Sequence, residues 1–299
     1  MILVQIPEQY FKSGRIAREM KAWIRQNLGV GSGILEIAER VEAEIERRGG
    51  SPAFPTGVGV NEVTAHYAPQ KDETGKIQES DVVKIDYGVH IDGYVADTSV
   101  TLSENPSYQS MLEATERALQ AAIDVVKRDR RIGEIGRAIE AAAQADGFRP
   151  ISNLSGHTIQ QYVVHAGKSI PNIYAVGLPM LNKGDVFAIE PFLTTRDAAG
   201  YVVESPAENI FSLAVRKRTG SKELDELTDM IWASRKTLPF SPRWFDQSYK
   251  EGRLIALLKE LEKRRLVRSY PTLVEASGKP VAQFEHTMTI EDGGLVILT

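Results

Sequence analysis

The sequence repeats part of its own pattern after about 100 residues, and this repeat constrains the fold more than any other feature. Residues 80–86 read Ser-Asp-Val-Val-Lys-Ile-Asp, and 104 residues later residues 184–190 read Gly-Asp-Val-Phe-Ala-Ile-Glu. Further pairs lie 98 or 99 residues apart: Glu36-Ile37 and Glu134-Ile135, Glu42 and Glu140, Gly49 and Gly147, Pro52 and Pro150, and His66 and His165. Such a repeat predicts two αβ halves related by a pseudo-twofold axis. Asp86 and Glu190 would then meet at the seam between the halves, flanked by His66 and His165.

The segment from Asp81 to Leu102 has the pattern of a β-hairpin. Residues 82–89 and 94–102 are rich in β-branched side chains, and Asp92-Gly93 is a typical two-residue turn. With this turn, Asp86 faces Ser99, and Asp97 lies one diagonal step away on the same face. Two carboxylates on a covered face are costly unless a cation compensates them, which favours half of a metal site. The alternative is that Asp97 faces solvent while Asp86 caps a backbone group.

Helical periodicity predicts two helices before this hairpin, two after it, and a helical insertion later in the chain. The expected helices are residues 8–28, 34–48, 108–126 and 132–146, and 222–236 and 247–265 in the insertion. Between about 207 and 270 the pattern becomes polar and helical, and strands are expected again from 281 to 290 and at the end of the sequence. We therefore expect a single α+β domain over residues 1–299 with an inserted helical subdomain at about 207–270.

The composition of the sequence limits which partners and which catalytic groups the protein can use. The sequence has 299 residues, a formal net charge of −4 and no cysteine. The charge argues against a nucleic-acid binder, although residues 216–268 hold fourteen Lys and Arg against eight Asp and Glu. Without cysteine, catalysis must use carboxylates, histidines or hydroxyls. No apolar run approaches the roughly 20 residues of a membrane span, so a cytoplasmic enzyme is expected.

Four carboxylates at expected strand centres, together with one histidine, form an oxygen-rich set. They are Asp86, Asp97, Glu190, Glu285 and His157. Such ligands suit two divalent metal ions, whose charge would balance the four carboxylates. Taken alone, each residue has a plainer interpretation: Glu190 before Pro191 could end a strand, Glu285 could be half-exposed, and His157 could be a hydrogen-bonded core histidine.

Several short motifs resemble those of the methionine aminopeptidases, in the short archaeal-like form of type II. The matching segments are His66, Lys84–Gly88, Ala96-Asp97, Leu154–His157, His165–Lys168, Ile189–Pro191 and Gln283–Thr287. The resemblance covers almost the whole chain, and the helical insertion before the last acidic residue is the mark of type II. It implies the pita-bread fold, in which two pseudo-symmetric αβ halves hold two metal ions between them.

The resemblance also implies the role of each site residue. Asp86 would chelate one metal, Asp97 and Glu285 would bridge both, and His157 and Glu190 would complete the other. The metals would be Co, Mn, Fe or Zn, and a water bridging them would attack the peptide carbonyl. Glu190 would carry its proton to the leaving amine, while His66 and His165 would hydrogen-bond the scissile amide and the oxyanion. Residues lining the methionine pocket would be Phe54, Val164 and Tyr270, alongside both histidines.

Two other functions are compatible with the sequence. An Xaa-Pro aminopeptidase or dipeptidase of the same fold would usually carry a large N-terminal domain, whereas here the first helix is expected from Glu8. A non-catalytic relative that binds ribosomes or RNA would be marked by missing ligands, and all of them are present. The expected partners are nascent polypeptide N-termini, with a weak ribosome association through the basic insertion and no membrane, and the chain is expected to be a monomer. His90 and His286 receive no role.

Overall fold

The computed structural model describes residues 5–245, 248–249 and 252–299. Its helices are α1 (Glu8–Asn27), α2 (Ile34–Arg47), α3 (Pro106–Val126), α4 (Ile132–Ala145), α5 (Lys222–Arg235), the 3-10 helix η1 (Pro242–Trp244) and α6 (Arg253–Lys263). Its strands are β1 (Ser51–Pro52), β2 (Gly57–Val60), β3 (Val63–Ala65), β4 (Val83–Ile91), β5 (Tyr94–Leu102), β6 (Phe148–Pro150), β7 (Ser155–Ile159), β8 (Ser169–Pro171), β9 (Val186–Ile189), β10 (Phe192–Thr195), β11 (Val202–Leu213), β12 (Val267–Glu275), β13 (Val281–Gln283), β14 (His286–Glu291) and β15 (Gly294–Ile297).

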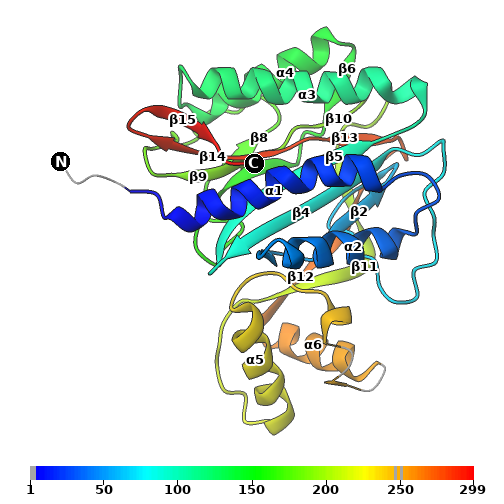
Figure 1. Ribbon diagram of the computed structural model, residues 1–299, viewed down its shortest axis with the longest axis vertical. Helices are drawn as coiled ribbons and strands as arrows, with labels where there is room; N and C mark the ends of the chain where they lie inside the picture. The colour runs from blue at the N-terminus through cyan, green and yellow to red at the C-terminus, as the bar shows by residue number, and fades with distance from the viewer. Residues whose placement is uncertain (1–4, 246–247, 250–251) are drawn as a thin grey trace.

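The expected two halves are present. α2 and α4 are both 14 residues long and begin 98 positions apart, at Ile34 and Ile132. Each is followed by a glycine with positive φ, Gly49 at 85° and Gly147 at 82°, which ends the helix without steric cost. α1 packs against β4 and β5, whereas α4 packs against β6 and β8 (Figure 1). The two αβ halves predicted from the repeat are confirmed, and the structure is of the α+β class.

The hairpin of β4 and β5 has the predicted register. Asp86 is paired with Ser99, and Asp97 is paired with Gly88. The turn residues Asp92 and Gly93 both have positive φ, 53° and 83°, as a type I′ turn requires. The hairpin therefore presents both carboxylates from adjacent, mutually fixed strands.

Two strands that the sequence pattern predicts as continuous are broken in the structure. The expected strand through Glu190 is split into β9 and β10, and the expected strand 281–290 is split into β13 and β14. At each break the chain passes from one sheet to another: β9 pairs with β14 in a five-stranded sheet, while β10 pairs with β13 in a three-stranded sheet. Pro191 has no N–H for the ladder, which favours the first break. Glu190 and Glu285 thus lie at sheet crossings and not at strand centres.

The segment between β11 and β12 contains α5, η1 and α6, and it projects from the end of the molecule opposite α3 and α4 (Figure 1). The ribbon of β11 and β12 itself was not predicted, because Pro206 and register shifts around Glu208 interrupt its alternation. The helix expected from Gln247 begins at Arg253 among the described residues, and Gln247 lies outside them. In the described part of the chain, no helix combines the length and apolar character needed to cross a membrane.

Candidate metal centre

Asp86 and Asp97 reach the cavity from the hairpin. Asp97 is only 4% exposed, which rules out the alternative that it faces solvent. Its backbone N–H donates to Thr287 Oγ1 at 2.8 Å, and the Thr287 hydroxyl donates to the carbonyl of Asp97 at 2.7 Å. The strand that carries Asp97 is therefore fixed to β14, which follows Glu285 directly.

His157 and Glu190 approach the same point from the second half. His157 is on β7, and Glu190 follows β9, the strand next to β7. His157 Nε2 lies 3.5 Å from Asp97 Oδ2 and 3.6 Å from Glu190 Oε1. Expected ligands from the two halves are thus in contact across the seam.

Glu285 completes the cluster from the crossing between β13 and β14. It is 1% exposed, and one ligand atom each from Asp97, His157 and Glu285 lie within 4.8 Å of one another. Its carbonyl accepts hydrogen bonds from Thr98 Oγ1 at 2.7 Å and from Lys21 Nζ at 3.0 Å. These contacts fix the backbone and leave the carboxylate directed at the cavity.

Burial and mutual repulsion of the carboxylates in this cluster favour bound cations. Burial raises the pKa of Asp86 to about 7, and burial together with neighbouring carboxylates raises the pKa values of Asp97, Glu190 and Glu285 well above their usual range. Among the described residues, Asp86 Oδ1 and Glu285 Oε1 are buried without any hydrogen-bond partner. Unpaired oxygens in an acidic, buried site fit divalent cations, which such oxygens ligate.

The remaining predicted residues line the same cavity, whose volume is about 420 Å³. The lining includes all ten predicted site residues: Phe54, His66, Asp86, Asp97, His157, Val164, His165, Glu190, Tyr270 and Glu285. The rings of His157 and His165 have centroids 4.4 Å apart, and those of His66 and Tyr270 are 5.6 Å apart. The cavity is therefore lined by acidic, imidazole and apolar side chains.

Sequence reasoning missed Gln283. Its Nε2 donates to Glu190 Oε2 at 3.2 Å, and its side chain also hydrogen-bonds to Asp86. Its position two residues before Glu285 in an expected strand, on the same face, is a signal that could have identified it. His90 and His286 do not line the cavity: His90 Nδ1 accepts from the N–H of Gly93, and His286 Nδ1 lies 3.0 Å from Thr299 Oγ1.

Two buried acidic half-sites joined across a pseudo-twofold seam are the features of a metallopeptidase scaffold. The model of metallopeptidase family M24 matches residues 8–221. A methionine aminopeptidase from Thermococcus kodakarensis is 42% identical over 293 residues, which are 98% of this chain and 99% of that protein. Another from Methanothermobacter thermautotrophicus is 36% identical over 300 residues, covering 99% of this chain and all of that protein. The chain belongs to the methionine aminopeptidases of metallopeptidase family M24, and it is an enzyme of the hydrolase class.

Solved structures agree with this fold. A thermophilic Arx1 superposes with a TM-score of 0.82 at 18% identity, covering 98% of this chain and 91% of that chain. A methionine aminopeptidase from Rickettsia prowazekii gives a TM-score of 0.69 at 20% identity, covering 97% and 95%. A prolidase from Pyrococcus furiosus gives 0.62 at 16% identity, covering 98% of this chain but 63% of the prolidase. At these identities the similarity establishes the fold alone.

Proposed function

We propose that this chain removes the N-terminal methionine from nascent proteins and peptides in a metal-dependent reaction. The observation that carries the proposal is the convergence of five ligand-type residues beside an apolar pocket, in a chain whose relatives of similar length are methionine aminopeptidases. Nascent N-termini are made in the cytoplasm, and this is the compartment we propose.

The described side chains fit two divalent ions, and we assign Co, Mn, Fe or Zn because carboxylate oxygens and one imidazole suit each of them. Asp86 would hold one ion, His157 and Glu190 the other, and Asp97 and Glu285 both. When bound, the ions would supply an activated water and polarise the peptide carbonyl. An internal peptide bond has no free α-amine that could bind to such a metal site, so the enzyme would act at chain ends alone.

The protein's own groups then position the proton transfer. Gln283 holds Glu190 Oε2, which leaves Oε1 on the side of His157 and the cavity. We assign Glu190 Oε1 to carry the proton from water to the leaving amine. Burial lowers the pKa of His66 to about 4, so at neutral pH its imidazole is uncharged and acts as a hydrogen-bond donor to the amide, together with His165.

The substrate side chain would occupy the apolar end of the cavity. Phe54 follows β1, Val164 lies in the turn after β7, and Tyr270 is on β12. Apolar groups drawn from three separate elements favour an unbranched, flexible thioether side chain over a charged one. These assignments rest on position in the cavity and on the family resemblance.

Hydrolysis of the peptide Met-Ala-Ser after removal of metal is the direct test. We expect no release of methionine from the chelated enzyme and recovery after addition of Co²⁺, Mn²⁺, Fe²⁺ or Zn²⁺. Xaa-Pro peptides, assayed in parallel, should remain intact. Full activity in protein shown to be metal-free by elemental analysis would refute the mechanism, and preferential cleavage of Xaa-Pro peptides, or no cleavage at all, would support one of the two alternative functions.

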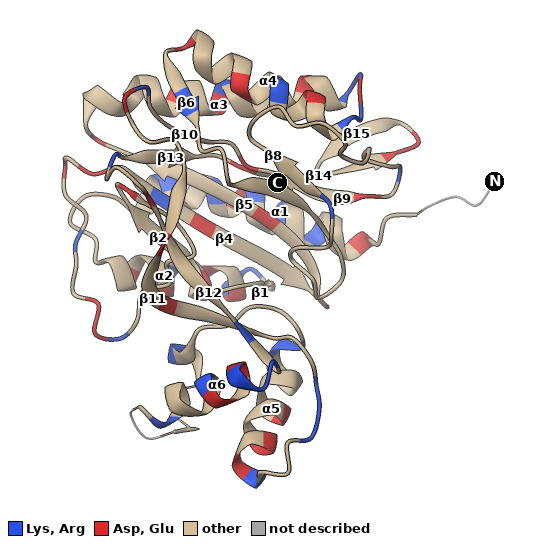
Figure 2. Cartoon of the chain, turned by 180° about the vertical axis from the view of Figure 1, so that it is seen from behind, with Lys and Arg blue, Asp and Glu red and all other residues tan. Residues whose placement is uncertain are grey.

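We further propose that the enzyme is a monomer that associates weakly with ribosomes through its insertion. Basic and acidic residues are mixed over the insertion (Figure 2), and several form ion pairs: Arg216 and Arg218 with Asp229, Arg253 with Glu223, and Arg264 with Glu260. In the described part of the chain, Lys217, Lys263 and Arg265 form no ion pair, and they would supply the attraction.

Co-sedimentation with ribosomes tests this association. Reversing the charges of Lys217, Lys263 and Arg265 should abolish it, whereas replacing Arg216, Arg218 and Arg264 by glutamine, which removes paired charges, should weaken it less. Ribosome binding that persists unchanged after this charge reversal would show that the insertion does not mediate the association. Sedimentation velocity of the free enzyme reports whether it is a monomer.

A further inference from the structure

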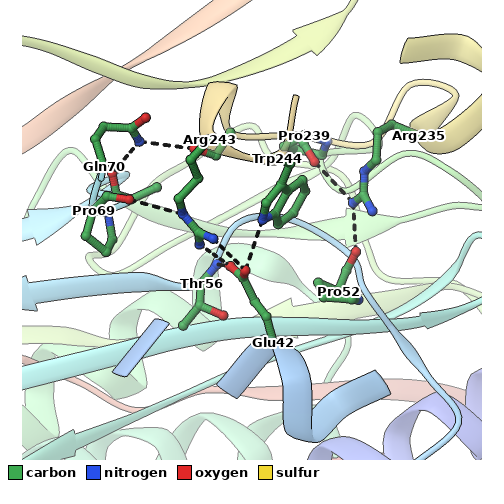
Figure 3. Close-up of polar contacts among 11 residues, drawn as sticks. Glu42, Pro52, Thr56, Pro69, Gln70, Arg235, Pro239, Arg243 and Trp244 are labelled. Atoms are coloured by element: carbon green, nitrogen blue, oxygen red, sulfur yellow. Dashed lines mark hydrogen bonds and ion pairs between the residues drawn. The ribbon is translucent and has the colours of Figure 1, made fainter. Parts of the chain in front are cut away.

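The guanidinium of Arg235, at the end of α5, holds two separate segments together. Its Nη2 donates to the carbonyls of Pro52 at 2.7 Å, Ala53 at 3.0 Å and Pro239 at 3.2 Å (Figure 3). Arg235 is 9% exposed, and within the described residues no carboxylate forms an ion pair with it. A buried arginine whose hydrogen bonds go to backbone carbonyls, from segments nearly 190 positions apart, fixes the relative position of those segments.

Both segments form walls of the substrate cavity. Phe54 and Pro55, which follow Ala53 directly, line it from the first half, and Pro239 lines it from the insertion. Phe54 also packs tightly against β4, since a Cβ on Gly88 would lie 2.4 Å from its ring. Movement between the two segments would therefore change the shape of the cavity beside Phe54, Pro55 and Pro239.

A second polar cluster reinforces the same junction. Glu42 on α2 accepts hydrogen bonds from Arg243 Nη1 at 2.8 Å, from Trp244 Nε1 at 2.9 Å and from the N–H of Thr56 at 3.0 Å (Figure 3). The side chain of Arg243 is 5% exposed, so this ion pair is shielded from solvent. The ring of Trp244 lies under the guanidinium of Arg235, with 4.6 Å from Cζ to the ring centroid. The two clusters are thus one connected unit between the insertion and the first half.

We propose that Arg235 is a positioning residue that sets the width of the side-chain pocket, and that selectivity for methionine depends on it. The proposal rests on the proposed function. Arg235 itself does not line the cavity and touches none of the expected metal ligands. Its effect should therefore appear in substrate recognition, with little effect on metal content or on the chemical step.

Replacing Arg235 by methionine keeps most of the side-chain volume but removes the donors to three carbonyls. The KM for Met-Ala-Ser should rise about tenfold, since a pocket altered by the size of one methylene changes discrimination by roughly 10–200-fold. The ratio of kcat/KM for Met-Ala-Ser over Leu-Ala-Ser should fall by a similar factor. kcat at saturation and metal content should change by less than about twofold. Arg235→Lys, which retains charge and donors, should recover part of the selectivity.

The matched control is Arg253→Met, which removes an exposed arginine of the same insertion that pairs with Glu223. It should leave KM, selectivity and kcat unchanged. Hydrogen–deuterium exchange of the metal-free proteins gives an activity-independent measurement: residues 52–56 and 237–241 should exchange faster in Arg235→Met than in Arg253→Met. If Arg235→Met does not fold, Trp244→Phe, which loses the indole hydrogen bond to Glu42 and part of the ring under Arg235, should shift selectivity in the same direction.

Unchanged selectivity and unchanged exchange in Arg235→Met would overturn the proposal, and so would an equal loss of kcat for every substrate. Failure of the proposed function is distinguishable, because the metal-loaded parent enzyme would then release no methionine from Met-Ala-Ser. In that case the exchange measurement still decides whether Arg235 fixes the two segments.

Discussion

At the scale of single residues, His66 combines an unusual backbone with an unusual side chain. It is one of the few non-glycine residues with positive φ, at 60°, a conformation that costs about 1–3 kcal/mol and persists where the surroundings enforce it. It directly follows β3, and the pairing of β3 with β12 helps to fix its position. Its lowered pKa keeps it neutral over the pH range in which such an enzyme works.

His66→Ala should lower kcat by about 10²–10³, because one hydrogen-bond donor to the developing oxyanion or amide is lost. Metal content, measured by elemental analysis, should be unchanged, since His66 is assigned to the substrate. His90→Ala, which removes an imidazole outside the cavity, should retain kcat. A parallel fall in metal content and activity would show that His66 is a ligand.

At the scale of secondary structure, local sequence patterns predicted the helices and the hairpin, but they did not predict which sheet each strand joins. The helices and the β4–β5 hairpin depend on periodicity and on a two-residue turn, which a short window of sequence contains. The crossings at Glu190 and Glu285 depend on which distant strand each segment meets, so the sequence pattern suggested continuous strands. The convergence of Asp86 and Glu190 was nevertheless predictable because of the repeat, and Gln283 could have been inferred from its place two residues before Glu285. Arg235 acts through tertiary contacts that no motif indicates.

Thr287→Val tests the contact that fixes the hairpin to β14. Valine keeps the shape but leaves the buried N–H and carbonyl of Asp97 without their side-chain partner. We expect a loss of about 1–3 kcal/mol in the free energy of unfolding, measured by urea denaturation, and weaker metal binding. Thr289→Val loses one bond to the carbonyl of Asp185, away from the cavity, and should leave metal affinity intact. Equal metal affinity in Thr287→Val and Thr289→Val would contradict the expectation that the contact between Thr287 and Asp97 supports metal binding.

At the scale of the whole molecule, the acidic cluster links stability to pH and metal. The pKa of Asp86 is raised from 3.8 to about 7, so the folded metal-free protein retains protons that the unfolded chain has released. The contribution of the protonated Asp86 to the free energy of unfolding is therefore full below about pH 4, and it is lost as the pH rises to about 7. Bound metal favours the ionised carboxylates and removes this loss.

Metal should accordingly raise the melting temperature more at pH 7.5 than at pH 5. At one hundred times its dissociation constant the stabilisation should be about 2.7 kcal/mol. Asp97→Asn removes one of the repelling charges, so it should reduce the metal-dependent shift while keeping or raising the melting temperature of the metal-free form. A lower metal-free melting temperature together with an intact shift would show that Asp97 is a structural acceptor instead of a ligand.

The expected ligands are spread widely along the chain, and this affects when the enzyme can bind metal during its synthesis. The first expected ligand is Asp86 and the last is Glu285, 199 positions later, and the last follows the whole helical insertion. During synthesis, Asp86 and Asp97 leave the ribosome long before Glu285 does. A growing chain therefore holds only a fragment of the coordination sphere, and tight metal capture must wait until translation is nearly over. We therefore expect the enzyme to take up metal tightly only after Glu285 has left the ribosome, so each molecule depends on the metal available at that stage.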